Sequence, residues 1–125
     1  MDKIRVLLAD DHTLIRSGIA TLLQTNKDFL VVGEAEDGEE AVRKTGELKP
    51  TVVVLDLSMP KLSGIEATKQ IKKKYPEVNV LVLTMHENEE YVYQILKSGA
   101  AGYVLKSAGK DELITAIRAA ATTCG

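Results

Sequence analysis

Short apolar runs alternate along the chain with segments whose apolar residues recur at helical spacing. The runs are apolar at consecutive positions rather than at every second one. This pattern predicts strands that are covered on both faces, as in a parallel sheet flanked by helices. The predicted strands are Ile4 to Ala9, Phe29 to Val32, Val52 to Leu55, Val80 to Leu83 and Gly102 to Leu105.

The segments between these runs predict helices. Asp37 precedes Glu40, and Ser63 precedes Glu66, at the spacing of a capping box, so helices are expected to begin just after Asp37 and Ser63. Asn88 is the predicted cap of another helix, and the last helix is expected over Asp111 to about Ala121. The stripes at helical period are Leu14, Ile15, Gly18, Ile19, Leu22 and Leu23, then Tyr91, Val92, Ile95 and Leu96, and finally Leu113, Ile114, Ile117 and Ala121.

Regular strand–helix alternation in a chain of 125 residues predicts a single α/β domain with a doubly wound sheet. The acids at the strand ends predict the strand order. Asp10 and Asp11 follow the first predicted strand, and Asp56 follows the third. Placing these two strands side by side, in the flavodoxin-like (βα)5 order 2-1-3-4-5, brings the acids to the crevice where such sheets bind ligands.

Composition limits which binding partners and which cellular compartment are expected. Hydrophobic residues make up 45% of the chain, enough for one buried core, and a formal net charge of -2 argues against tight nucleic-acid binding by this chain alone. The single cysteine, Cys124, cannot form an intrachain disulfide, so cytoplasmic residence is expected. The apolar stretch after Arg5, Val6 to Ala9, is too short for a signal peptide or a membrane span.

The clustered carboxylates have a chemical consequence. Charge of that density is costly unless a positive ion lies among it, which predicts a divalent-cation site. Magnesium prefers oxygen ligands and is commonly held by one or two carboxylates plus a phosphate oxygen, so Asp11 and Asp56 are its expected ligands. A carboxylate oxygen that stays free can attack phosphorus. The chain is therefore a candidate phosphoryl acceptor.

Two further strand ends carry groups that suit a phosphate. Thr84 ends the fourth predicted strand with a hydroxyl, and Lys106 follows the fifth with a mobile positive charge. Each residue type alone is ordinary at a strand end. Their joint placement with the acids favours one shared pocket.

A combined motif is formed by Leu8-Ala9-Asp10-Asp11-His12, Leu55-Asp56-Leu57-Ser58-Met59-Pro60, Leu83-Thr84 and Gly102-Tyr103-Val104-Leu105-Lys106. It resembles the receiver domains of two-component response regulators, and the resemblance covers essentially the whole chain, residues 1–125. The tracts Leu83 to Glu87 and Lys97 to Tyr103 are similar to LuxR-type (NarL-like) transcriptional regulators, whose receivers precede a DNA-binding helix-turn-helix.

The resemblance implies a role for each acid. Asp56 would accept a phosphoryl group from a sensor histidine kinase. Mg2+, or Mn2+ in its place, would be bound by Asp11, Asp56 and the backbone carbonyl of Ser58, with Asp10 helping to position the metal. As in the family, the expected chemistry is limited to self-phosphorylation and self-dephosphorylation, so no separate enzymatic activity is expected.

The resemblance also implies a two-state switch. Thr84 and Lys106 would hold the phosphoryl group, and Tyr103 would turn inward into the space that the threonine leaves. The added negative charge would create new hydrogen bonds and change a packed surface, or the pairing of two receivers in a homodimer. DNA would be bound only through a C-terminal domain that this chain lacks.

The sequence departs from the family near the site. Met85 is bulky where many receivers have a small residue, and His86 follows at a position that influences phosphate hydrolysis in the family. Ser107 stands where many receivers have a proline joined by a cis peptide, so a trans bond is expected after Lys106. His12, like His86, fits either a solvated loop or a role at the site.

Alternative functions stay open from the residues alone. A stand-alone receiver would act through protein–protein contacts, with or without phosphorylation. An aspartyl-nucleophile phosphohydrolase resembling haloacid dehalogenases would need a second acid two residues after the nucleophile, where this chain has Ser58. A flavodoxin-like cofactor carrier would need glycine in the loop from Asp10 to Thr13, which is acidic instead.

Overall fold

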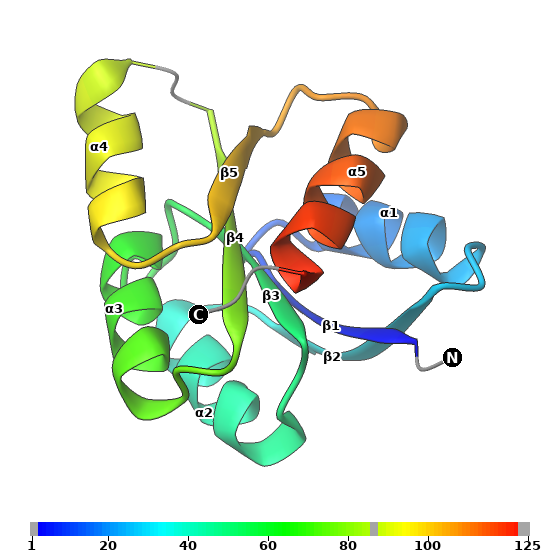
Figure 1. Cartoon of the computed structure of the whole chain (residues 1–125), viewed down its shortest axis with the longest axis horizontal. Helices are drawn as coiled ribbons and strands as arrows, with labels where there is room; N and C mark the ends of the chain where they lie inside the picture. The colour runs from blue at the N-terminus through cyan, green and yellow to red at the C-terminus, as the bar shows by residue number, and fades with distance from the viewer. Residues whose placement is uncertain (1–2, 86–87, 123–125) are drawn as a thin grey trace.

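The computed structural model describes residues 3–85 and 88–122 and shows a twisted parallel sheet between two layers of helices (Figure 1). The strand order is β2-β1-β3-β4-β5, which confirms the predicted flavodoxin-like topology. The strands are β1 (Ile4–Ala9), β2 (Phe29–Ala35), β3 (Val52–Asp56), β4 (Asn79–Thr84) and β5 (Gly102–Leu105), and the helices are α1 (Thr13–Gln24), α2 (Gly38–Leu48), α3 (Gly64–Lys74), α4 (Glu89–Lys97) and α5 (Lys110–Ala121).

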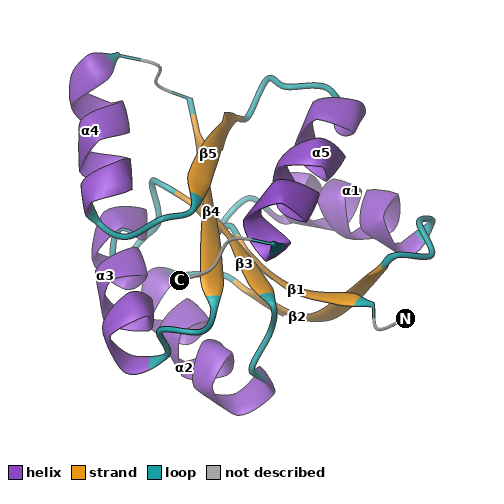
Figure 2. Cartoon of the chain, viewed as in Figure 1, coloured by secondary structure: helices purple, strands orange, loops and turns teal. Residues whose placement is uncertain are grey.

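Helices cover both faces of the sheet, as the uninterrupted apolar runs predict. Helices α1 and α5 lie on one face, and α2, α3 and α4 lie on the other (Figure 2). Alternate residues of each strand point to opposite layers. In β1, for example, Leu7 packs toward α2 and α3, whereas Val6 and Leu8 pack toward α1 and α5.

The predicted helix caps are confirmed. The side chain of Asp37 accepts a hydrogen bond from the Glu40 backbone N–H at 2.8 Å, and Ser63 accepts one from Glu66 at 3.3 Å. Asn88 caps α4 by accepting from the Tyr91 N–H at 3.0 Å. These bonds satisfy donors that a helix start otherwise leaves open, and they fix where the loops from the sheet end.

Two expectations need correction. Strand β2 continues three residues beyond Val32, through Gly33 and Glu34 to Ala35, because an edge strand tolerates polar and small residues. The pairing with β1 shifts by one residue at Val32, opposite Val6 and Leu7, and then continues to Ala35. The apolar stripe of α1 is also only partly buried. Leu14 is 88% exposed, whereas Arg16 is buried because it pairs with Glu34 of β2.

Candidate functional site

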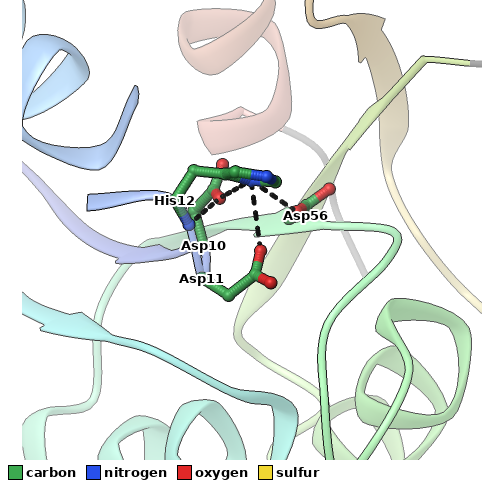
Figure 3. Close-up of side chains that lie close together, drawn as sticks. All are labelled: Asp10, Asp11, His12 and Asp56. Atoms are coloured by element: carbon green, nitrogen blue, oxygen red, sulfur yellow. Dashed lines mark hydrogen bonds and ion pairs between the residues drawn. The ribbon is translucent and has the colours of Figure 1, made fainter. Parts of the chain in front are cut away.

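The neighbouring strands β1 and β3 bring the acids together. Ala9 pairs with Leu55 in the parallel register, so the next residues, Asp10 and Asp56, lie side by side at the carboxyl end of the sheet. Both are only 2% exposed, and the side chain of Asp11 reaches the same cluster from the loop, where it is 35% exposed (Figure 3). The prediction that the acids lie together at one edge of the sheet is confirmed.

Lys106 enters the cluster from β5. Its Nζ lies 3.0 Å from Asp56 Oδ2 and 3.5 Å from Asp10 Oδ2, and its side chain is 12% exposed. The Lys106 backbone N–H donates to the Thr84 carbonyl at 2.9 Å, which fixes the lysine at the mouth of the pocket after the strand pairing ends. A single ammonium therefore faces two buried carboxylates.

Thr84 and Ser58 lie next to this cluster, and Tyr103 lies on the strand that precedes Lys106. Thr84 ends β4 between the strands that carry Asp56 and Lys106, and it is fully buried. Tyr103 is half-buried on β5 and packs on the side of the sheet that α4 covers. Ser58 is exposed, and its backbone N–H donates to Asp56 Oδ1 at 3.3 Å.

Burial raises the pKa of Asp56 above its ordinary value of 3.8, and the neighbouring Asp10 raises it further. The Lys106 ammonium and the Ser58 N–H oppose this rise. Within residues 3–85 and 88–122, the buried Oδ2 atoms of Asp10 and Asp56 accept no hydrogen bond of good geometry, although Lys106 pairs with both by charge. Buried, incompletely satisfied oxygens of this kind are suitable ligands for a hard divalent cation.

Sequence reasoning missed one residue of the site, Arg16, and gave two readings for another, His12. Arg16 is buried, and its guanidinium donates to the Asp10 backbone carbonyl and, at 2.8 Å, to Glu34 Oε1. The available signal was a charged residue inside the apolar stripe of α1. For His12 the sequence allows a solvated loop or a role at the site, and both fit: its side chain is 57% exposed, and its Nδ1 lies 3.1 Å from Asp10 Oδ1 and 3.2 Å from Asp11 Oδ1.

The loop surroundings agree with two further sequence observations. No cis peptide is present in the described residues, so the bond between Lys106 and Ser107 is trans, as expected without proline. Met85 is 77% exposed and lines a surface depression next to the site, together with His12 and Lys106. His86 and Cys124 lie outside the described residues.

Gly64 fixes the path of the loop that follows Asp56. Its N–H donates to the Leu57 carbonyl at 2.8 Å, and a Cβ at this position would lie 2.4 Å from the Asp56 carbonyl oxygen. Because the obstructing atoms belong to the backbone, they cannot rotate away. Glycine therefore lets α3 start directly against the strand end that presents Asp56.

We predict that Gly64→Ala lowers the free energy of unfolding by about 2 kcal/mol, a cost typical of overpacking a tight site. Thermal or urea unfolding measures it. Gly18→Ala is the matched control, because nothing lies within 4 Å of its added Cβ and alanine favours the helix, so it should stabilise by about 0.5 kcal/mol. Equal stability of Gly64→Ala and the parent would contradict the tight packing described here.

Comparison with known proteins agrees with this geometry. The model of the response regulator receiver domain family matches residues 6–118. The transcriptional regulatory protein DegU of Brevibacillus brevis is 43% identical over 120 residues, which are 96% of this chain and 51% of DegU. The oxygen regulatory protein NreC of Staphylococcus haemolyticus is 43% identical over 116 residues, which are 92% of this chain and 54% of NreC.

The solved structures show the same relationship. The signal receiver domain of the response regulator NarL from Mycobacterium tuberculosis superimposes with a TM-score of 0.95 at 33% identity, over 99% of this chain and 100% of that domain. The chain belongs to the response regulator receiver domain family. Its relatives and structural neighbours include regulators of the LuxR type, and it spans about half the length of the curated relatives it matches.

In residues 3–85 and 88–122, no helix is both long and apolar enough to cross a membrane.

Proposed function

We propose that this chain is a phosphorylation-dependent signalling receiver in which Asp56 accepts a phosphoryl group from a sensor histidine kinase. The observation that carries the proposal is the placement of the Lys106 ammonium 3.0 Å from the buried Asp56 carboxylate, with Asp10 beside it and Asp11 in the same cluster. A nucleophile, a counter-charge and the groups of a candidate cation site thus lie together at the carboxyl end of the sheet.

In the proposed reaction, an Asp56 carboxylate oxygen attacks the phosphorus of a phosphohistidine, the P–N bond breaks, and an aspartyl phosphate forms while the histidine leaves. Asp10, Asp11, Asp56 and the Ser58 carbonyl would hold Mg2+, or Mn2+ in its place. The bound ion supplies neutralisation of the charge that gathers on the transferred group. Lys106, already aimed at Asp56, pairs with a phosphoryl oxygen.

The proposed switch uses residues next to the phosphoryl group. Thr84 ends β4 at the site, and its hydroxyl would bond to the phosphoryl group. Tyr103, on the neighbouring strand, would then turn into the vacated space. This exchange changes the surface formed by α4, β5 and α5, because a packed region relaxes between discrete arrangements rather than continuously.

The wider role is proposed from the relatives. DegU is by name a transcriptional regulatory protein, and residues 1–125 would be the receiver part of a comparable cytoplasmic regulator that binds DNA through a separate helix-turn-helix domain. A phosphorylation-dependent homodimer is the expected output. A stand-alone receiver that acts by protein–protein contact is the alternative. No turnover of a separate substrate is expected.

The direct test is phosphoryl uptake from acetyl phosphate, measured by intact mass with Mg2+ and again after chelation. The parent chain is expected to gain one phosphoryl group only when Mg2+ is present, and peptide mapping after borohydride reduction should place it on Asp56. Uptake on another residue, or no uptake, would overturn the proposal. Sizing of the same samples tests the dimer separately.

Lys106→Ala is predicted to uncouple phosphoryl uptake on Asp56 from the change of the α4 and β5 surface that follows it. The ammonium pairs with both carboxylates, and a charge-assisted contact of this kind is worth about 1.5–3 kcal/mol, so labelling should slow by about ten- to hundredfold. The phosphorylated variant should show none of the change in hydrogen exchange that the parent shows at β5 and α4. Lys69→Ala, on the exposed side of α3, is the control and should behave as the parent does.

A further inference from the structure

A groove runs between α1 and α5, on the face of the sheet that these two helices cover (Figure 2). Its volume is about 260 Å3. Its floor is formed by Leu83 of β4 and Val104 of β5, which belong to the buried core of this layer. The apolar side chains of its helical walls are Leu14, Ile15, Ile19 and Leu22 of α1 and Leu113 of α5. The three acids of the candidate site do not line it, so the groove is a separate feature.

Gly18 shapes the wall that α1 contributes to this groove. A Cβ at residue 18 would meet nothing within 4 Å, so no close contact requires glycine there. Glycine nevertheless weakens a helix interior relative to alanine. Because Gly18 lines the groove and has no side chain, it leaves the middle of the groove wide. A long side chain at this position would fill that space.

The charge along the groove has one sign. Its charged lining residues are Lys106 and Lys110, and no acid lines it, since Asp111 and Glu112 in the first turn of α5 lie outside it. The ammonium of Lys106 is paired within the acidic cluster. Lys110 is exposed, and among residues 3–85 and 88–122 it has no ion-pair partner. It begins α5 after Gly109, which gives that helix no side-chain cap, so an anion at this rim meets an ammonium and the positive end of a helix.

We propose that this groove binds a free short-chain fatty acid anion, with the acyl chain between α1 and α5 and the carboxylate at Lys110. Apolar walls with a few polar groups are typical of small-molecule sites, which commonly have volumes of about 300–1,000 Å3. The groove is slightly smaller, so it accommodates one short chain such as that of octanoate rather than a bulky ring system. A cationic amphiphile would be repelled by the lysines. The inference does not depend on phosphorylation of Asp56.

The test is a titration of the metal-free, 15N-labelled chain with sodium octanoate below its micelle concentration, followed by the NMR shifts of backbone amides. Saturable shifts are expected at the residues of α1 and α5 that line the groove. From hexanoate to octanoate, each added CH2 should lower the dissociation constant about fourfold, because the chain is buried between apolar walls. Octylamine, which is cationic at neutral pH, should bind at least about tenfold more weakly than octanoate.

Two variants test the position of the ligand. Gly18→Leu fills the groove and should abolish octanoate binding, whereas Ser17→Leu, at an exposed neighbour that does not line the groove, is the matched control and should bind as the parent does. Lys110→Gln should weaken octanoate binding about fivefold and leave binding of uncharged 1-octanol unchanged. This pair of ligands tests the inference even if Gly18→Leu does not fold.

Several results would overturn the proposal. They are the absence of saturable octanoate binding, unchanged binding by a folded Gly18→Leu, and equal binding of octylamine and octanoate. Pelleting of the parent with phosphatidylglycerol vesicles in the absence of octanoate binding would instead assign the groove to a membrane surface. A dimer in sizing experiments that Gly18→Leu abolishes, again without octanoate binding, would assign it to a second copy of the chain.

Discussion

Asp56→Asn is expected to abolish phosphoryl uptake completely and, in metal-free solution, to make the fold more stable than the parent. Uptake is lost because the amide is not a nucleophile, whereas the shape of the side chain and its bond from the Ser58 N–H are retained. Stability rises because burial and the adjacent Asp10 both oppose the charge on Asp56. Intact mass after acetyl phosphate treatment and thermal unfolding in chelator measure the two effects.

The gain in stability should depend on pH in a defined direction. The pKa of Asp56 is raised in the folded state above its ordinary value of 3.8, so the fold favours the protonated acid. The stabilisation from that proton is complete below the unfolded-state pKa and is lost as the pH rises through the folded-state pKa. The advantage of Asp56→Asn is therefore small at acid pH and largest once Asp56 is ionised in the folded chain.

A bound divalent cation should make the parent more stable than Asp56→Asn. At a Mg2+ concentration of about 100 times the dissociation constant, a ligand that binds only the folded state stabilises by about 2.7 kcal/mol, and the parent should gain far more of this than Asp56→Asn. Asp28→Asn is the matched control, because it removes an exposed acid paired with Arg118 and should cost about 0–1 kcal/mol with or without metal. A destabilised, still labelled Asp56→Asn would contradict both arguments.

The sheet and its order could be predicted because burial on two faces leaves an unmistakable pattern. In β3 and β4 every residue is buried, so the apolar runs and the strands nearly coincide. Apolar runs no longer identify a strand where only one face of the strand, or neither face, is buried. The end of β2 carries Gly33 and the exposed Glu34, and nothing in their polarity distinguishes them from a loop.

The candidate site also contains residues that could be placed from the sequence and one that could not. Asp10, Asp11 and Asp56 could be placed together because parallel strands end at one edge of a sheet, and Lys106 followed from the same rule. Side-chain direction is not fixed by strand order. The ring of His12 turns toward the acids through a loop conformation that residue type alone does not encode.

Arg16→Met is expected to be the most destabilising of the substitutions proposed here, at about 3 kcal/mol, which is about 10 °C in the unfolding midpoint. The guanidinium is buried, and it joins the Asp10 carbonyl to Glu34 on β2. Methionine fills much of the volume but leaves the carbonyl without its donor. Because this carbonyl belongs to Asp10, which would hold Mg2+ in the proposed function, Mg2+ should also stabilise the variant less than the parent.

Arg43→Met is the control for Arg16→Met, because it removes an exposed arginine instead of a buried one. Arg43 is 58% exposed on α2, and among residues 3–85 and 88–122 its ion pairs are with Glu40 and Glu47 of the same helix, so its replacement should cost about 0–0.5 kcal/mol and leave the response to Mg2+ unchanged. Glu34→Gln should cost less than Arg16→Met, because the amide still accepts from the guanidinium and the carbonyl keeps its donor. If Arg16→Met unfolded at the same temperature as Arg43→Met, the buried arginine would not be what ties the Asp10 loop to β2.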